Sequence, residues 1–114
     1  MILYGIANCD TVKRARAWML AHRHADCAFH DFKKSGVPPE RLDAWLAAVD
    51  WQVLLNRKGT AWRKLDAATQ AAVIDAASAR ALMLVQPSVI KRPVVEWPDG
   101  RITVGFDEAR WARF

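Results

Sequence analysis

The chain has 114 residues, of which 53% are hydrophobic and 25% are charged, and its formal net charge is +5. This length predicts one domain with a core of its own, and the composition excludes an intrinsically disordered chain. No stretch approaches the roughly 20 apolar residues of a membrane span, and no basic segment precedes the first apolar residues, so we expect a cytoplasmic protein without a membrane partner. Lys and Arg are scattered singly and in pairs, which disfavours nucleic acid as a partner.

The first 32 residues predict a strand, a helix and a second strand. Residues 1–5 (MILYG) form a short apolar run typical of a buried strand, and residues 10–23 carry apolar side chains at helical spacing. Residues 27–32 (CAFHDF) are expected to be a strand with Ala28, His30 and Phe32 on one face. This order indicates a βαβ unit with a parallel strand pair.

Residues 38–86 predict an almost wholly helical segment. Apolar residues at positions 42, 45, 46 and 49 have the spacing of an amphipathic helix, and Pro39 suits its first turn. A loop over residues 56–60 follows. Three later helices are expected to begin at the capping residues Thr60, Asp66 and Ser78.

The C-terminal residues return to strands. Pro87 is expected to end the helices, and residues 93–97 and 101–104 are β-type runs joined by the turn Pro98-Asp99-Gly100. Residues 107–113 predict a short final helix. The whole order predicts an α/β fold, residues 1–114 forming a single domain in which one mixed sheet is interrupted by a helical insertion at about 37–86.

The two cysteines, Cys9 and Cys27, are too few for a disulfide scaffold and lack CxxC spacing. A redox reaction at Cys9 therefore needs a thiol from outside the chain. We interpret Cys27 as a small core residue, with a resolving role as the alternative. The three histidines, at positions 22, 24 and 30, do not have ligand spacing, so no metal site is expected.

Cys9 lies where the first strand passes into the first helix. Unpaired N–H groups and the partial positive charge of a helix N-terminus favour a thiolate, and they can also hold an oxyanion. Lys13 lies one turn along and either adds a cation beside the sulfur or is only a solvated helix charge, while Asn8 either orients the cysteine loop or makes a turn. Two interpretations remain open at this point: a reactive thiolate stabilised by Asn8 and Lys13, or a small residue filling a tight turn.

Motifs along the whole chain resemble the arsenate reductase-like (ArsC/Spx) family, and most closely its YffB branch. They are YGIANCDTVKRAR, LLNRKGTAWRKL, and QPSVIKRPVV followed by DGRITVGF. The resemblance implies a thioredoxin-like (glutaredoxin-like) fold with a helical insertion, and it implies that Cys9 is the catalytic residue. It further implies that Arg92 helps to bind an anionic substrate or glutathione, and that Pro93 is the cis-proline near the cysteine.

The chain departs from the arsenate reductases of that family at two arginines of the oxyanion site. The corresponding positions are Asn56 and Gly105. Arg57 lies one position along and is the candidate replacement, but three arginines around one oxyanion are not reproduced. We therefore expect weak coordination of arsenate.

These observations predict a thiol-dependent oxidoreductase, a glutathione-dependent thiol–disulfide reductase with Cys9 as its single nucleophile. Arg57 and Arg92 are expected to bind a carboxylate of glutathione or another anion, beside Pro93. Glutathione is expected as a co-substrate and not as a bound cofactor, and the other partner is a small thiol, disulfide or oxyanion. Two alternatives remain: an arsenate reductase using the same cysteine, and a Spx-like regulator that binds RNA polymerase, in which Cys9 is a sensor or a vestige.

Overall fold

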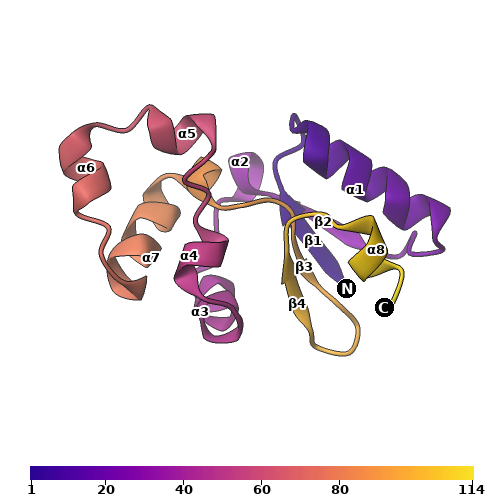
Figure 1. Ribbon diagram of the computed structural model, residues 1–114. Coiled ribbons are helices and arrows are strands. Elements are labelled where there is room, and N and C mark those ends of the chain that lie inside the picture. The colour runs from indigo at the N-terminus through magenta and orange to yellow at the C-terminus, as the bar shows by residue number, and fades with distance from the viewer. The chain divides into compact units, whose positions relative to one another are not determined.

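The computed structural model describes residues 1–114, which form two compact units (Figure 1). Unit 1 comprises residues 1–31 and 92–114, and unit 2 comprises residues 32–91. Unit 2 extends a few residues beyond the helical insertion predicted at 37–86. That residues 1–114 act as one domain stays a prediction.

Unit 1 contains a four-stranded mixed sheet in the order β2-β1-β3-β4. The central strand β1 (Ile2–Gly5) runs parallel to β2 (Ala28–Asp31) and antiparallel to β3 (Val94–Glu96), which pairs in turn with β4 (Ile102–Val104). The predicted parallel pair, hairpin and mixed sheet are therefore confirmed.

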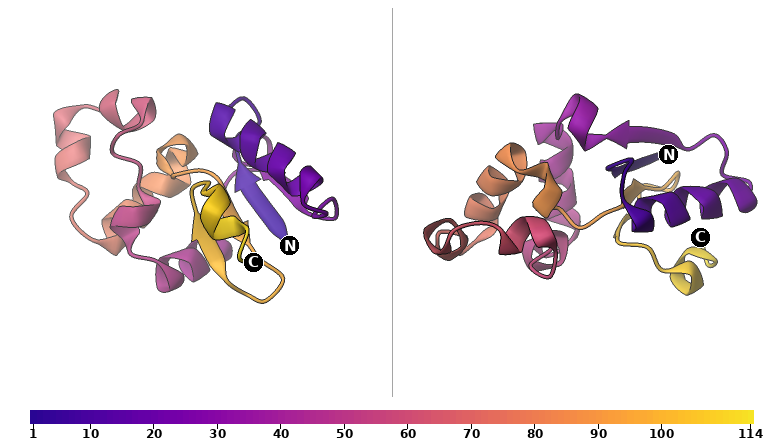
Figure 2. Two further views of the ribbon diagram at one scale, coloured as in Figure 1. Left: turned by 45° about the vertical axis from the view of Figure 1, so that its right-hand side comes forward. Right: turned by 90° about the horizontal axis from the view of Figure 1, so that it is seen from above.

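Two helices cover one face of this sheet, α1 (Asp10–Ala21) and the short α8 (Glu108–Trp111) (Figure 2). Apolar side chains of both helices pack with those of β1, β3 and the residue after β3: Leu3, Val12, Ala15, Trp18, Met19, Val95, Trp97 and Trp111. The indole N–H of Trp97 donates to the buried hydroxyl of Thr103 at 2.9 Å, so this core leaves neither group without a partner. The helical spacing of the apolar residues in α1 thus becomes a buried stripe.

The second strand is shorter than predicted, because β2 ends at Asp31 and Phe32 begins the helical turn α2 (Phe32–Ser35). Phe32 therefore does not share a strand face with Ala28 and His30. Its ring is buried and lies 6.1 Å from that of Trp45, both in unit 2. Packing of this aromatic pair outweighs the alternation that suggested a longer strand.

Unit 2 is helical, as predicted. After α2 come α3 (Pro39–Ala48), α4 (Trp51–Leu54), α5 (Thr60–Arg63), α6 (Ala67–Ala71), α7 (Ala76–Val85) and the 3₁₀ turn η1 (Pro87–Val89). Pro39 occupies the first helical position of α3, where its missing N–H costs nothing. No helix in either unit has the length and apolar character needed to span a lipid bilayer.

Of the three capping residues predicted to begin helices in unit 2, one is confirmed as an N-cap and two are wrong. Asp66 caps α6 by accepting from the backbone N–H of Thr69 at 2.7 Å. The N-cap of α5 is Gly59, however, so Thr60 is already its first helical residue. The N-cap of α7 is Asp75, and Ser78 lies in the first turn, where its side chain completes a capping box with Asp75.

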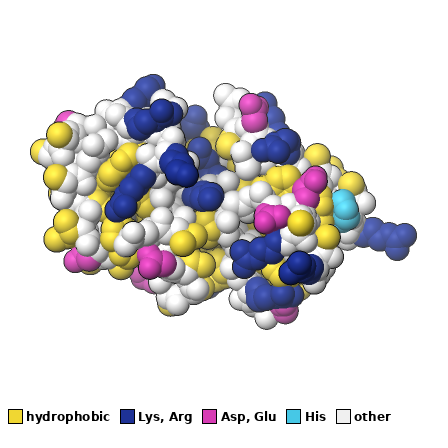
Figure 3. Space-filling view, in the orientation of Figure 1, with side chains coloured by type: hydrophobic (Ala, Val, Ile, Leu, Met, Phe, Trp, Pro, Cys, Tyr) yellow, Lys and Arg dark blue, Asp and Glu magenta, His cyan; other side chains and the backbone are white.

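Positive charge is concentrated in unit 2. Its residues include nine Lys and Arg against five Asp and Glu, whereas unit 1 has eight against seven. Lys and Arg side chains gather over α5 and the chain around it (Figure 3). Most of the chain's net charge of +5 therefore lies on the helical unit.

Candidate active site

Cys9 is the N-cap residue of α1. The chain leaves β1 at Gly5, crosses three residues and reaches Cys9 in an extended conformation, with φ −140° and ψ 123°. The carbonyl of Cys9 accepts the first helical hydrogen bond, from the backbone N–H of Lys13 at 2.9 Å. The predicted junction of strand and helix is confirmed, and the half-buried sulfur occupies the place of a capping oxygen.

Gly5 allows the first turn of α1 to approach β1 closely. A Cβ atom at this position would lie 2.8 Å from Cγ2 of Val12, which is itself completely buried. Real carbon atoms do not approach so closely, so only glycine leaves Val12 where it is. Sequence reasoning did not single out this residue, which leaves room for the side chain of Val12, three residues after Cys9.

The surroundings of the sulfur favour its anion. Partial burial raises the pKa of the Cys9 thiol, but the backbone N–H of Val12, the guanidinium of Arg92 and the backbone N–H of Thr11 together hold that pKa below its ordinary value. No N-cap hydrogen bond of standard geometry forms to the side chain. The backbone N–H groups of Val12 and Thr11 favour the thiolate as hydrogen-bond donors, in keeping with the unpaired N–H groups of a helix N-terminus.

Arg92 is the charged side chain that lowers the pKa of Cys9, because a hydrogen bond from its guanidinium and its positive charge both favour the thiolate. The peptide bond between Arg92 and Pro93 is cis, as the resemblance implied for Pro93. The carbonyl of Pro93 accepts from the backbone N–H of Gly105 at 2.8 Å, which ties this segment to the end of β4. Arg92 was predicted to bind an anion; its contact with the thiol is an addition that the sequence spacing of 83 residues did not reveal.

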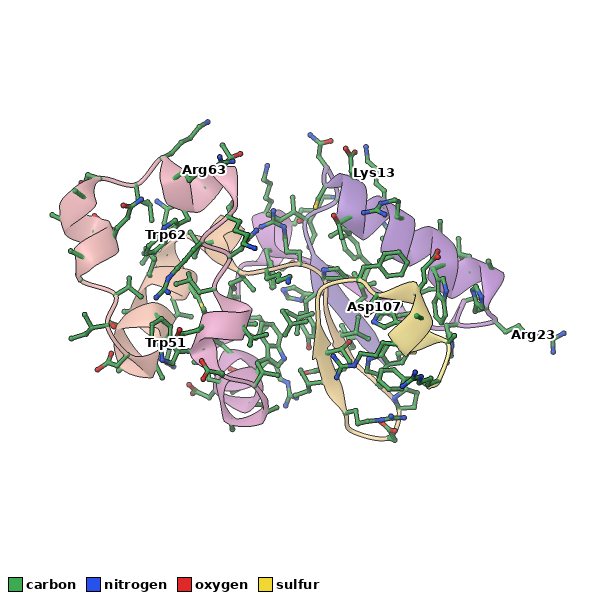
Figure 4. All side chains as sticks on the ribbon, viewed as in Figure 1. Lys13, Arg23, Trp51, Trp62, Arg63 and Asp107 are labelled. Carbon is green, nitrogen blue, oxygen red and sulfur yellow. The ribbon has the colours of Figure 1, made fainter.

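Asn8 and Lys13, the two residues predicted to stabilise the thiolate, are both exposed. Lys13 lies on the open side of the first turn of α1 (Figure 4). The groups found to lower the pKa of Cys9 are instead the two amides and Arg92. The roles of Asn8 and Lys13 stay predictions.

Arg57 belongs to unit 2, in the loop between α4 and α5. Its guanidinium carbon lies 5.2 Å from the ring centre of Trp51 and 5.9 Å from that of Trp62, which are contributed by α4 and α5 (Figure 4). The loop is shaped by Asn56, whose side-chain oxygen accepts from the backbone N–H of Lys58 at 3.2 Å. A part for Arg57 in binding glutathione stays a prediction.

The two departures from an arginine-rich oxyanion site have local structural causes. Asn56 makes the turn just described, which an arginine side chain cannot make in the same way. Gly105 is buried and has a φ of 84°, in the left-handed region that side-chain-bearing residues rarely adopt. At both positions the backbone conformation suits the residue that is present.

Cys27 lies at the other end of β1 from Cys9. It precedes Ala28, which pairs with Ile2 at the start of β1, whereas Cys9 follows the far end of that strand. The first and last Cα atoms of β1 are roughly 10 Å apart, beyond the Cα–Cα distance of a disulfide. Burial raises the pKa of the Cys27 thiol. The structure thus offers one activated thiol, and no three His, Cys, Asp or Glu side chains lie close enough together to hold a metal ion.

Comparison with known proteins agrees with this arrangement. The ArsC family model matches residues 4–114. The chain belongs to the ArsC family. It is similar to a solved protein named YffB, with 49% identity, a TM-score of 0.89, and coverage of 98% of this chain and 96% of that one. The ArsC fold therefore accounts for the sheet and its helices, and the predicted thioredoxin-like α/β fold is confirmed.

Two further proteins are similar to this chain over nearly its full length. An arsenate reductase (ArsC) related protein from Brucella melitensis is 50% identical, with a TM-score of 0.74 over 99% of this chain and 92% of that one. A protein of Haemophilus influenzae described as uncharacterized is 34% identical over 109 residues, covering 96% of this chain and 93% of its own. In all three comparisons the similarity covers nearly the full length of this chain.

Proposed function

We propose that the protein is a glutathione-dependent thiol reductase in which Cys9 is the only nucleophile. The observation that carries this proposal is the position of the Cys9 sulfur at the N-terminus of α1, beside Arg92, where its pKa is lowered. A lowered pKa increases the fraction of thiolate near neutral pH, and the thiolate is the form that attacks disulfides. Membership of the ArsC family supports the same reaction class.

The reaction has two exchange steps. The Cys9 thiolate attacks the glutathione sulfur of a mixed disulfide, forms a Cys9–glutathione disulfide and releases the substrate as a thiolate. A second glutathione then attacks through its own thiolate, which regenerates Cys9 and leaves oxidised glutathione. Each step breaks one S–S bond and forms another. Over the two steps the second glutathione thiolate is oxidised to the disulfide, the substrate sulfur is reduced to a thiolate, and Cys9 returns unchanged.

Charge explains how glutathione is held during the exchange. Arg92 already lies at the sulfur, so it can pair with a glutathione carboxylate or with the departing thiolate. In this proposal Arg57 binds a second carboxylate, Asn8 and Lys13 support the thiolate, and Pro93 contacts the bound glutathione. The reaction needs a reduced glutathione pool, which suits the cytoplasmic location expected from the sequence.

The decisive experiment measures both steps with purified protein. A glutathionylated peptide should be reduced in the presence of glutathione and glutathione reductase, and mass spectrometry should find a glutathione adduct on Cys9. Cys9→Ser should abolish turnover and adduct, while Cys27→Ser should leave both unchanged because its thiol lies at the other end of β1. Turnover that survives Cys9→Ser would disprove the mechanism.

Arsenate reduction is a second candidate, favoured by the 50% identity to the arsenate reductase (ArsC) related protein of Brucella melitensis. Asn56 and Gly105 stand against it, because neither position supplies a guanidinium for the oxyanion. The same assay with arsenate as oxidant separates the two. The arsenate reductase would be favoured if glutathione is consumed faster with arsenate than with the glutathionylated peptide. This consumption should depend on both arsenate and Cys9.

A further inference from the structure

Four basic side chains surround α5, and we refer to Arg57, Lys58, Arg63 and Lys64 as the α5 patch. All four are exposed, and they occur within eight consecutive residues that contain no Asp or Glu. None of them forms an ion pair within the chain. The patch is visible among the Lys and Arg side chains over α5, and Arg63 extends from that helix (Figures 3 and 4).

The acidic residues that flank the patch in sequence do not neutralise it. Asp50 accepts from the backbone N–H of Gln52 at 2.7 Å and caps α4, and Asp66 accepts from Thr69 at 2.7 Å and caps α6. Both carboxylates are therefore already hydrogen-bonded to the backbone of their own helices. The positive charge of the patch is left for a ligand from outside.

Arg57 lies beside two indoles and has a guanidinium suited to a carboxylate or phosphate. Its guanidinium lies over the rings of Trp51 and Trp62, which restrict the side chain without using its N–H groups. Those N–H groups form a planar fork, and a fork of this kind binds a carboxylate through two parallel hydrogen bonds. The three neighbouring cations would attract further negative charges on the same ligand.

The same contacts argue against a nucleic acid as the ligand. Single-stranded nucleic acids are held by bases that stack on aromatic side chains. Arg57 already lies over both indoles, and both are half-buried, so an open stacking platform is not offered. A flexible acidic polypeptide needs only the cations.

We propose that the α5 patch binds an Asp- and Glu-rich segment of the protein whose mixed disulfide Cys9 reduces. This inference rests on the proposed function, and it narrows the substrate class to glutathionylated proteins that carry an acidic segment. The patch supplies affinity for the substrate. Arg57 is shared with the proposed function, in which it binds a carboxylate of glutathione, whereas Lys58, Arg63 and Lys64 serve the acidic segment alone. Because the four side chains are exposed, binding is strongest at low ionic strength and weakens as salt is added.

The test compares two glutathionylated peptides that differ only in a run of Glu replaced by Gln. The wild-type protein should reduce the Glu peptide with a kcat/KM several-fold higher than that for the Gln peptide, because KM is lower for the Glu peptide. This preference for the Glu peptide should disappear when the salt concentration is raised. The double variant Arg63→Glu with Lys64→Glu should lose or reverse the preference and keep the Gln peptide rate. Equal kcat/KM for the two peptides, with turnover intact, overturns the inference and leaves the proposed function standing.

The control is Lys33→Glu with Lys34→Glu, which makes the same change in net charge at another exposed lysine pair of unit 2. It should keep the preference, and a preference lost in both double variants would overturn the assignment to the α5 patch. Arg57→Lys retains the charge but not the fork, so it should reduce the preference only in part. Circular dichroism checks that each variant is folded.

A binding measurement separates this inference from the proposed function. In Cys9→Ser, fluorescence anisotropy with a labelled Glu peptide should show the same salt-sensitive binding, even if no turnover is found with the wild-type protein. No binding in this variant overturns the inference. A labelled oligothymidylate that binds more tightly than the Glu peptide, through the same four residues, would overturn the choice of ligand.

Discussion

Arg92 and Cys9 are 83 positions apart in the sequence, yet one guanidinium acts on one sulfur. Arg92→Ala removes the hydrogen bond and the positive charge that lower the pKa of Cys9, so that pKa should rise. Alkylation of Cys9 near neutral pH should slow several-fold, and its pH profile should shift to higher pH. The rate against pH, followed by mass spectrometry, measures this directly.

The matched control for this variant is Arg101→Ala, which removes an exposed guanidinium from the same unit. Arg101 pairs with Asp99 in the hairpin turn and is not among the groups that lower the pKa of Cys9. Arg92→Lys should give an intermediate profile, since it keeps the charge but not the geometry. A profile that is the same in Arg92→Ala and in the wild type would disprove the role of Arg92.

Some residues of the candidate site could be predicted from the sequence, and others could not. Cys9, Arg92 and Pro93 were found because motif positions name residues, and the expected helix start predicted that backbone N–H groups favour the thiolate. The effect of Arg92 on the pKa of Cys9 was not found, because an 83-residue separation has no local pattern. Gly5 was missed for a similar reason, because its function is to leave out a side chain that Val12 would meet.

At the scale of the elements, the contact between β1 and α1 can be tested through Gly5. Gly5→Ala places a Cβ atom 2.8 Å from Val12, so the first turn of α1 must move or its packing must change. Overpacking of this kind costs about 1–3 kcal/mol in unfolding free energy. Chemical denaturation should show that loss, and the alkylation rate of Cys9 should change with it.

A second substitution makes the prediction specific. Val12→Ala removes the methyl groups that the new Cβ atom meets, so Gly5→Ala should cost clearly less in a Val12→Ala background than in the wild type. If the losses of unfolding free energy from Gly5→Ala and Val12→Ala are additive, Gly5 is not needed for the close approach of Val12 to β1. In that case the position of Cys9 would depend on the loop over residues 6–8 alone.

The end of β4 offers a prediction about substrate range. Restoring an arginine by Gly105→Arg should not create arsenate reduction, because φ at this buried position is 84°. A side chain in such a backbone conformation costs about 1–3 kcal/mol, so the variant should instead have a lower melting temperature. Thermal unfolding measures the change in melting temperature, and the arsenate assay measures whether the variant reduces arsenate. A stable variant that reduces arsenate would contradict the structural reason given for Gly105.

The elements also show which sequence signals were sufficient. The helices with apolar spacing and the hairpin with its Pro-Asp-Gly turn were predicted, because their periodicity and turn chemistry are local. The end of β2 and two helix starts were wrong. Phe32 leaves the strand to pack on Trp45, and Asp75 takes the N-cap of α7 while Ser78 supports it from the first turn.

On the scale of the whole molecule, the separation of the two thiols predicts its oxidation chemistry. Because Cys9 and Cys27 lie at opposite ends of β1, oxidised glutathione should give one adduct per chain, on Cys9, and no internal disulfide. The raised pKa of Cys27 adds to this selectivity. Peptide mapping after oxidation identifies the site, and a Cys9–Cys27 crosslink in the folded protein would contradict the sheet register.

Because Cys9 is the N-cap of α1, the charge on its sulfur also affects the stability of the first turn of that helix. The folded state lowers the pKa of Cys9, so by linkage the thiolate stabilises the fold above the unfolded-state pKa of about 8.5, and this stabilisation is lost as pH falls through the lower folded-state pKa. In a glutathione adduct the Cys9 sulfur carries no negative charge, so the amides of Thr11 and Val12 lose their interaction with the thiolate. Hydrogen exchange at these two amides should therefore quicken each time Cys9 is occupied and slow each time it is released.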